Sequence, residues 1–112
     1  MSVFKLCFYV PESHVDTVKN AVFAAGAGRI GNYDSCAWQV LGQGQFRPLD
    51  GSTPFIGEQD QVQVVPEYRV DMVCAETVLS AAIAALKLSH PYEEPAYDVT
   101  RLENFETDNI RK

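Results

Sequence analysis

The segment from His90 to Asp98 gathers the side chains in this sequence that are best suited to chemistry. An imidazole, His90, is followed within five positions by two carboxylates, Glu93 and Glu94. Prolines at positions 91 and 95 hold φ near a fixed value and disfavour helical geometry at the residues before them. The segment is therefore predicted to form a rigid corner between a helix and a strand.

Such a corner offers one nitrogen and several oxygens to a divalent metal ion, with His90, Glu93 and Glu94 as the candidate ligands. A closed zinc site normally has four ligands, with more His or Cys than are present here. The sequence therefore predicts at most a weak or shared site at a subunit boundary, and a divalent metal ion is the one candidate cofactor. In the competing interpretation, which we favour, the glutamates bind arginines or backbone amides, because clustered charges more often serve structure.

A pocket for a small ligand is the second candidate site. Tyr33 and Tyr92 follow turns rich in glycine and proline, which makes them better pocket candidates than Trp38, an expected core or interface residue. Arg29 and Arg47 would supply positive charge to an anionic ligand, and Asn32 is grouped with Arg29 and Tyr33 as a candidate ligand-binding residue.

The sequence argues against catalysis. Nucleophilic catalysis needs a nucleophile beside a base that a third group orients, and neither His14 nor His90 lies near a cysteine in sequence. The glycines of Gly26–Gly31 match the letters G-x-G-x-x-G, but they close a predicted helix, whereas a dinucleotide fingerprint needs them between a strand and a helix. We expect no enzyme activity and no dinucleotide site.

Composition restricts the class of protein. The 112 residues are 46% hydrophobic, enough for the core of one domain, and the net charge of −6 argues against binding to nucleic acid or to an anionic membrane. Three widely spaced cysteines without a C-x-x-C motif suggest reduced thiols. The first residues lack the layout of a signal peptide and the hydrophobic runs are too short to span a membrane, so we expect a cytoplasmic protein.

Hydrophobic periodicity predicts six elements. Strands are expected at 3–10, 32–41, 62–74 and 97–102, with helices from Pro11 to Gly26 and from 75 to 88. Pro66 suggests an edge position or a bulge in the third strand. A long connection, 42–61, is expected either to fold back onto the body or to contact a protein partner. Residues 1–103 are predicted to form the domain and 104–112 a polar tail.

This order of elements predicts an α+β, ferredoxin-like βαββαβ fold, with a four-stranded antiparallel sheet and both helices on one face. The other face is left bare. Its residues Val3, Cys7 and Tyr9 are half apolar, so burial against copies of the same chain is expected.

Two motifs resemble a known family. Gly26-Ala-Gly-Arg-Ile-Gly-Asn-Tyr33 and His90-Pro-Tyr-Glu-Glu-Pro-Ala-Tyr-Asp98 resemble the YqfO-type domain, which occurs alone and as an insert in Nif-three-like dinuclear-metal proteins. The resemblance implies a PII-like and CutA-like fold and a homo-oligomer, with a trimer favoured over a dimer. It also implies that loop 42–61 sits where PII proteins carry a partner-contacting loop. The nucleotide motifs of PII and the metal motifs of the Nif-three-like core are not visible, so neither activity carries over.

Together these observations predict a non-enzymatic, PII/CutA-like oligomeric module with a ligand-binding or regulatory role. The alternative is a divalent-metal, copper-type binding protein that uses the His90 corner. A small metal-assisted hydrolase is the second alternative.

Overall fold

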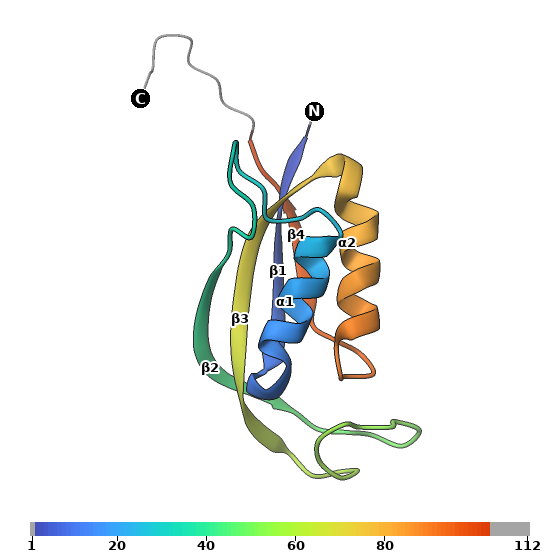
Figure 1. Cartoon of the computed structure of the whole chain (residues 1–112). Helices are drawn as coiled ribbons and strands as arrows, with labels where there is room; N and C mark the ends of the chain where they lie inside the picture. The colour runs from blue at the N-terminus through green and yellow to red at the C-terminus, as the bar shows by residue number, and fades with distance from the viewer. Residues whose placement is uncertain (1, 104–112) are drawn as a thin grey trace.

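A computed structural model describes residues 2–103, in which two helices cover one face of a single antiparallel sheet (Figure 1). The strands lie side by side in the order β2-β3-β1-β4. The elements are β1 Val3–Pro11, a 3₁₀ turn Glu12–His14, α1 Val15–Ala24, β2 Trp38–Phe46, β3 Gln63–Ala75, α2 Glu76–Ser89 and β4 Tyr97–Arg101. The predicted ferredoxin-like arrangement is confirmed, while the predicted tail, 104–112, lies outside the described residues. Among the described helices, none has the length and apolar character that a bilayer crossing requires.

The core lies between the sheet and the helices. Leu6, Phe8 and Val10 of β1 alternate toward the helices and are fully buried. Each such side chain contributes about 1.5 to 3 kcal/mol relative to exposure. The helices complete the core with a set of small and branched side chains: Val15, Val18 and Val22 from α1, and Ala82 and Leu86 from α2.

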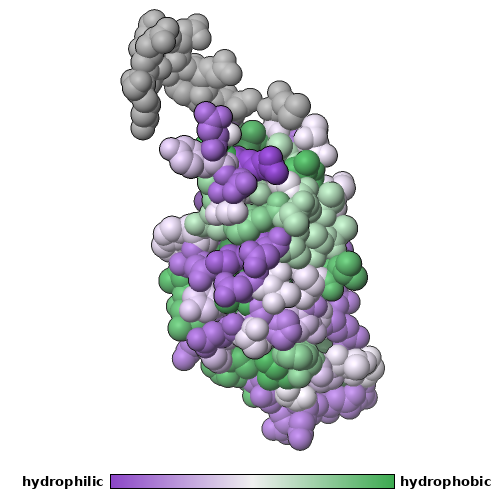
Figure 2. Space-filling model, in the orientation of Figure 1, coloured by the Kyte–Doolittle hydropathy of each residue, from purple (hydrophilic) through white to green (hydrophobic). Residues whose placement is uncertain are grey.

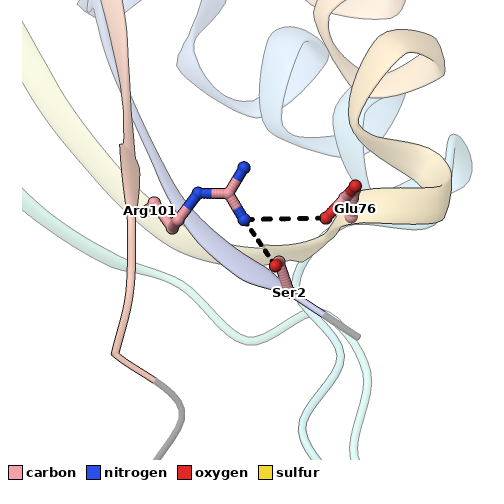
Figure 3. A network of polar contacts seen from close by, with 3 residues as sticks. All are labelled: Ser2, Glu76 and Arg101. Atoms are coloured by element: carbon pink, nitrogen blue, oxygen red, sulfur yellow. Dashed lines mark hydrogen bonds and ion pairs between the residues drawn. The ribbon is translucent and has the colours of Figure 1, made fainter.

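One polar network joins the ends of three elements (Figure 3). The guanidinium of Arg101, at the end of β4, donates to the hydroxyl of Ser2 and lies 3.8 Å from the carboxylate of Glu76. The same guanidinium lies over the ring of Phe4, 4.7 Å from its centre. These contacts fix β4 and the start of α2 to the start of β1.

The second strand begins six residues later than predicted and continues to Phe46. The reason is that residues 26–36, which we call the strap, bind the edge of β3 at Val73, beyond the point where β2 begins to pair. The amide of Gly28 donates to the carbonyl of Val73 at 2.8 Å, and the amide of Cys36 donates to the carbonyl of Gly28 at 2.8 Å. Gly28 has φ of +76°, a left-handed conformation that favours glycine. Residues before Trp38 are therefore kept off β3, and β2 extends at its other end into the predicted connection 42–61.

Pro66 lies where β3 has a neighbouring strand on one side only, as expected for a residue that has no N–H to donate. Pairing of β3 with β1 ends where Glu67 meets Pro11, so Pro66 faces only Gln43 of β2. Beyond that point β2 and β3 continue as a two-stranded ribbon that carries the loop 47–62 to one end of the molecule (Figure 1). This end of the sheet is where the cavity described below lies.

The bare face of the sheet carries a row of paired residues. Cys7 lies between Asp98 and Asp71, and Asp71 lies opposite Trp38. Cys7 is buried by its neighbours, whereas Trp38 is 63% exposed and so is not a core residue. Asp71 binds Arg69 through Oδ2 at 3.2 Å, but its Oδ1 is buried without a hydrogen-bond partner among residues 2–103. The opposite, helical side of the molecule shows a mixture of hydrophilic and hydrophobic surface (Figure 2).

Candidate functional site

A cavity of about 410 Å³ lies between the corner that follows α2 and the loop 47–62. We call it the corner cavity. Its wall combines side chains from the ends of β1 and β2, from the middle of β3, from the loop and from the corner. The residues that line it are Tyr9, Gln45, Phe46, Arg47, Pro48, Leu49, Ser52, Pro54, Phe55, Ile56, Glu67, Tyr92, Glu93, Glu94 and Ala96.

His90 fixes the corner to the sheet. Its Nε2 lies 2.7 Å from the carbonyl oxygen of Tyr9, and its Nδ1 lies 3.1 Å from the amide nitrogen of Tyr92. Because the amide can only donate, Nδ1 is the acceptor and Nε2 carries the proton. The side chain is buried, and this burial lowers the pKa of the imidazole below its ordinary value. His90 is therefore a neutral structural link.

Tyr92 stands at the centre of the wall. Its ring lies 4.9 Å from that of His90, 5.8 Å from Phe46 and 6.4 Å from Phe55. Its hydroxyl donates to Oε2 of Glu67 at 2.8 Å. Burial, followed by the hydrogen bond to Glu67, raises the pKa of Tyr92 above its ordinary value, so the phenol stays protonated and donates.

Because Gly44 has no side chain, the carboxylate of Glu67 fits beside its backbone. A Cβ atom at this position would overlap the Glu67 carboxylate, whereas a Cβ atom at Gly42, two residues earlier in β2, would meet nothing within 4 Å. The glycine at position 44 thus has a steric reason that the sequence alone did not reveal.

The loop folds back onto the body, one of the two outcomes expected for it. The amide of Thr53 donates to Oε1 of Glu93 at 2.9 Å. Phe55 meets the ring of His14 edge-on at 5.4 Å, and His14 is half-buried. The prediction that a glutamate of the corner binds a backbone amide is confirmed for Glu93.

The five residues predicted to bind a ligand do not form one site. Tyr92 and Arg47 line the corner cavity, but Arg29, Asn32 and Tyr33 belong to the strap. The strap meets β3 at Val73, six residues from Glu67, which corresponds to about 20 Å of strand. Tyr33 is 74% exposed, and Arg29 lines a separate, shallow hollow with Asp34. The prediction grouped them because the chain gave no sign of where the strap attaches.

Two of the three predicted metal ligands, His90 and Glu93, have protein partners in this structure. Both ring nitrogens of His90 are engaged in hydrogen bonds, and one oxygen of Glu93 binds Thr53. Within residues 2–103, no three side chains of His, Cys, Asp or Glu are grouped closely enough to hold a metal ion. In this structure His90 links the corner to the sheet, and Glu93 and Glu94 line the corner cavity.

The electrostatic character of the corner cavity differs from the prediction. Glu67, Glu93 and Glu94 face a single cation, Arg47. In the part of the chain that the structure describes, none of these four side chains forms an ion pair within 4 Å. The wall thus carries an excess of negative charge. Sequence reasoning missed Glu67, which lies 25 positions from Tyr92, because no local signal connects the two.

The chain is similar in sequence to part of several longer proteins. No family model matches the chain. It is 44% identical over 103 residues to a GTP cyclohydrolase 1 type 2 homolog of Halalkalibacterium halodurans, a match that covers 92% of this chain and 28% of that protein. The protein of the same name from Mycobacterium leprae is 46% identical over 101 residues, covering 90% and 26%. The chain therefore spans about a quarter of the length of these relatives.

Solved structures agree with the sequence matches. A Bacillus cereus protein related to NIF3 superposes with a TM-score of 0.79 and 36% identity, over 92% of this chain and 26% of that one. CutA from Xylella fastidiosa superposes with a TM-score of 0.68 over 95% of this chain and 88% of its own, at 15% identity, which shows the fold alone. The chain is thus a homologue of one segment of the NIF3-related, YqfO-type proteins, and this segment has the CutA-like ferredoxin fold.

Proposed function

We propose that this chain is a non-enzymatic, self-assembling module that binds a small ligand in the corner cavity. The observation that carries the proposal is the cavity itself: about 410 Å³, with aromatic side chains from the sheet, loop and corner in one wall. Sites for small molecules are typically concave, largely apolar and furnished with a few polar groups. The corner cavity matches this description.

A catalytic role is less well supported. The relatives are named for GTP cyclohydrolase, but the chain corresponds to about a quarter of each of them. Its buried histidine uses both ring nitrogens to hold the corner. Burial raises the pKa of the thiols of Cys7 and Cys74, which disfavours the nucleophilic thiolate. We therefore assign ligand binding, and not turnover, to the cavity.

Self-association is proposed for the bare face of the sheet. Trp38 and Val40 are 63% and 44% exposed there, beside Oδ1 of Asp71, which has no hydrogen-bond partner in the described part of the chain. Exposed hydrophobic surface next to a buried acceptor suits an interface that supplies both contact and a hydrogen-bond donor. A trimer is favoured over a dimer, by analogy with the fold relatives.

Light scattering tests this part of the proposal. The wild-type chain should elute as a multiple of 12.4 kDa, with about 37 kDa for a trimer. Trp38→Glu should shift the mass to that of one chain, because it places a charge in the interface. The matched control is Leu88→Glu, at a helix position that is 90% exposed, and it should leave the mass unchanged. A monomeric wild-type chain at 100 μM would contradict the proposal.

Binding in the cavity is tested by NMR with a library of small, uncharged and charged aromatic fragments. At least one fragment should shift the amide signals of Phe46, Phe55 and Tyr92 in a saturable way. Phe46→Ala should weaken that binding by about fivefold or more, since a stacked aromatic contact is worth roughly 1 kcal/mol or more. Val62→Ala, in the same connection but outside the cavity wall, is the control. If no fragment shifts these signals at millimolar concentration, the assignment of the cavity fails.

A further inference from the structure

We infer that the corner cavity selects a small organic cation, namely a protonated amine or a related group attached to a flat apolar body. The inference rests on the proposed function, because it specifies the ligand class of the same cavity. It follows from two independent features of the wall, its charge and its aromatic rings.

The charge of the wall disfavours anions. Three carboxylates, those of Glu67, Glu93 and Glu94, face the single guanidinium of Arg47. The whole chain carries a net charge of −6, so the surrounding potential is negative too. A phosphate or carboxylate entering the cavity would meet more repulsion than attraction, whereas a cation would meet the reverse.

Free acceptor atoms are available at the wall. Glu67 is half-buried, and its Oε2 accepts the Tyr92 hydroxyl at 2.8 Å. Neither Oε1 of Glu67 nor Oε2 of Glu93 receives a hydrogen bond from residues 2–103. An ammonium group has three donors and no acceptor, so it can satisfy these oxygens without leaving a lone pair opposed to them.

The aromatic rings supply the second feature. Phe46, Phe55 and Tyr92 come from three separate segments, and their centres lie 5.8 Å and 6.4 Å apart in successive pairs. A cation within about 6 Å of such a ring centre is attracted by the ring quadrupole. The same rings, with Pro48, Pro54 and Leu49 beside them, accommodate a flat apolar body. A hydrated inorganic ion would gain nothing from this part of the wall.

Three matched probes test the inference, because they share a phenyl group and a two-carbon linker. These are 2-phenylethylammonium, 2-phenylethanol and 3-phenylpropionate, titrated at pH 7.5 while the amide signals of Phe46, Phe55 and Tyr92 are followed by NMR. We expect the ammonium probe to bind about tenfold more tightly than the alcohol, and the carboxylate not to saturate. GTP is included as an anionic probe and should not shift these signals.

Charge variants separate the cavity from the overall field of the protein. Glu67→Gln keeps an acceptor for the Tyr92 hydroxyl and removes one negative charge, so it should weaken the ammonium probe about fivefold and leave the alcohol unchanged. Glu94→Gln should have a similar effect. Glu58→Gln removes the same charge from the same loop region, but outside the wall, and should change neither affinity. A well-dispersed NMR spectrum confirms that each variant is folded.

The outcomes distinguish whether the cavity binds small molecules at all from whether it prefers cations. If 3-phenylpropionate or GTP saturates the cavity signals more tightly than the ammonium probe, the cavity is a binding site and the cationic class is wrong. Equal affinities of the ammonium probe and the alcohol, or an equal effect of Glu58→Gln, also overturn the cationic class. If no probe shifts the signals, both the class and the proposed function fail.

Discussion

The imidazole Nε2 of His90 lies 2.7 Å from the carbonyl oxygen of Tyr9, 81 positions earlier in the chain. The amide of the same Tyr9 donates to the carbonyl of Ala96 at 3.2 Å. The corner that follows α2 thus binds both the carbonyl and the amide of Tyr9, just beyond Phe8 and Tyr97, where the pairing of β1 with β4 ends. The corner thus extends the hydrogen bonding along β1 that β4 begins, although the corner itself is not a strand.

Replacement of His90 should therefore lower the free energy of unfolding. His90→Ala leaves the carbonyl of Tyr9 without its partner and opens a cavity behind the corner, so we expect a loss of about 2 to 3 kcal/mol in the free energy of unfolding. Urea unfolding measures this loss. His90→Gln, which retains a donor near the position of Nε2, should lose less than half as much. Equal losses for the two variants would show that the hydrogen bond is not what His90 contributes.

The buried imidazole also predicts how stability depends on pH. Burial lowers the pKa of His90 in the folded protein, against opposing effects of the Tyr9 carbonyl and Glu67 and with a further lowering by His14. The unfolded chain then binds a proton below about pH 6.5, where the folded protein does not. The contribution of the neutral His90 to the free energy of unfolding is therefore present above about pH 6.5 and is lost progressively as the pH falls below that value. Thermal unfolding at pH 7.5 and pH 5.5 should show this decrease in the wild type and a smaller one in His90→Gln.

Two glycines of β2 form a matched pair for the steric role of Gly44. Gly44→Ala should displace the Glu67 carboxylate and break its hydrogen bond with Tyr92, whereas Gly42→Ala meets open space. Because both substitutions change the strand propensity equally, their difference isolates that hydrogen bond. We expect Gly44→Ala to be less stable than Gly42→Ala by about 1 to 2 kcal/mol in urea unfolding. A difference below the error of the measurement would contradict the role assigned to Gly44.

Metal titration should not reveal a site that depends on His90. Its two ring nitrogens already hold the corner, so binding of a metal ion would require the loss of one of these bonds. Isothermal titration with Cu²⁺, Zn²⁺, Mn²⁺ and Ni²⁺ should therefore give the same result for the wild type and for His90→Gln. A binding event present in the wild type and lost in His90→Gln would restore the metal alternative.

The fold was predictable because its signals are local. The alternation of Leu6, Phe8 and Val10 and the helical spacing of Val15, Val18 and Val22 appear directly in the sequence, and each matches a buried stripe. The helix after β3 was placed within one residue at each end for the same reason.

The candidate site was predictable only in part, since it depends on contacts distant in sequence. The prolines correctly indicated that the helix gives way to a corner at His90. Glu67 and Tyr92 meet across 25 positions, and the strap reaches Val73 through a single glycine amide. Neither contact produces a periodic pattern in the sequence. The negative charge of the cavity and the separation of Arg29 from Arg47 are therefore visible only in the tertiary structure.

The hydrogen bond between the Thr53 amide and the Glu93 carboxylate has one more consequence. It joins loop 47–62 to the corner, and it lies at an exposed position. A bond of this kind opens at little energetic cost, whereas the strands beneath it are held by the buried core. Opening of this bond would widen the cavity at the side of the loop and leave the pairing of the sheet unchanged.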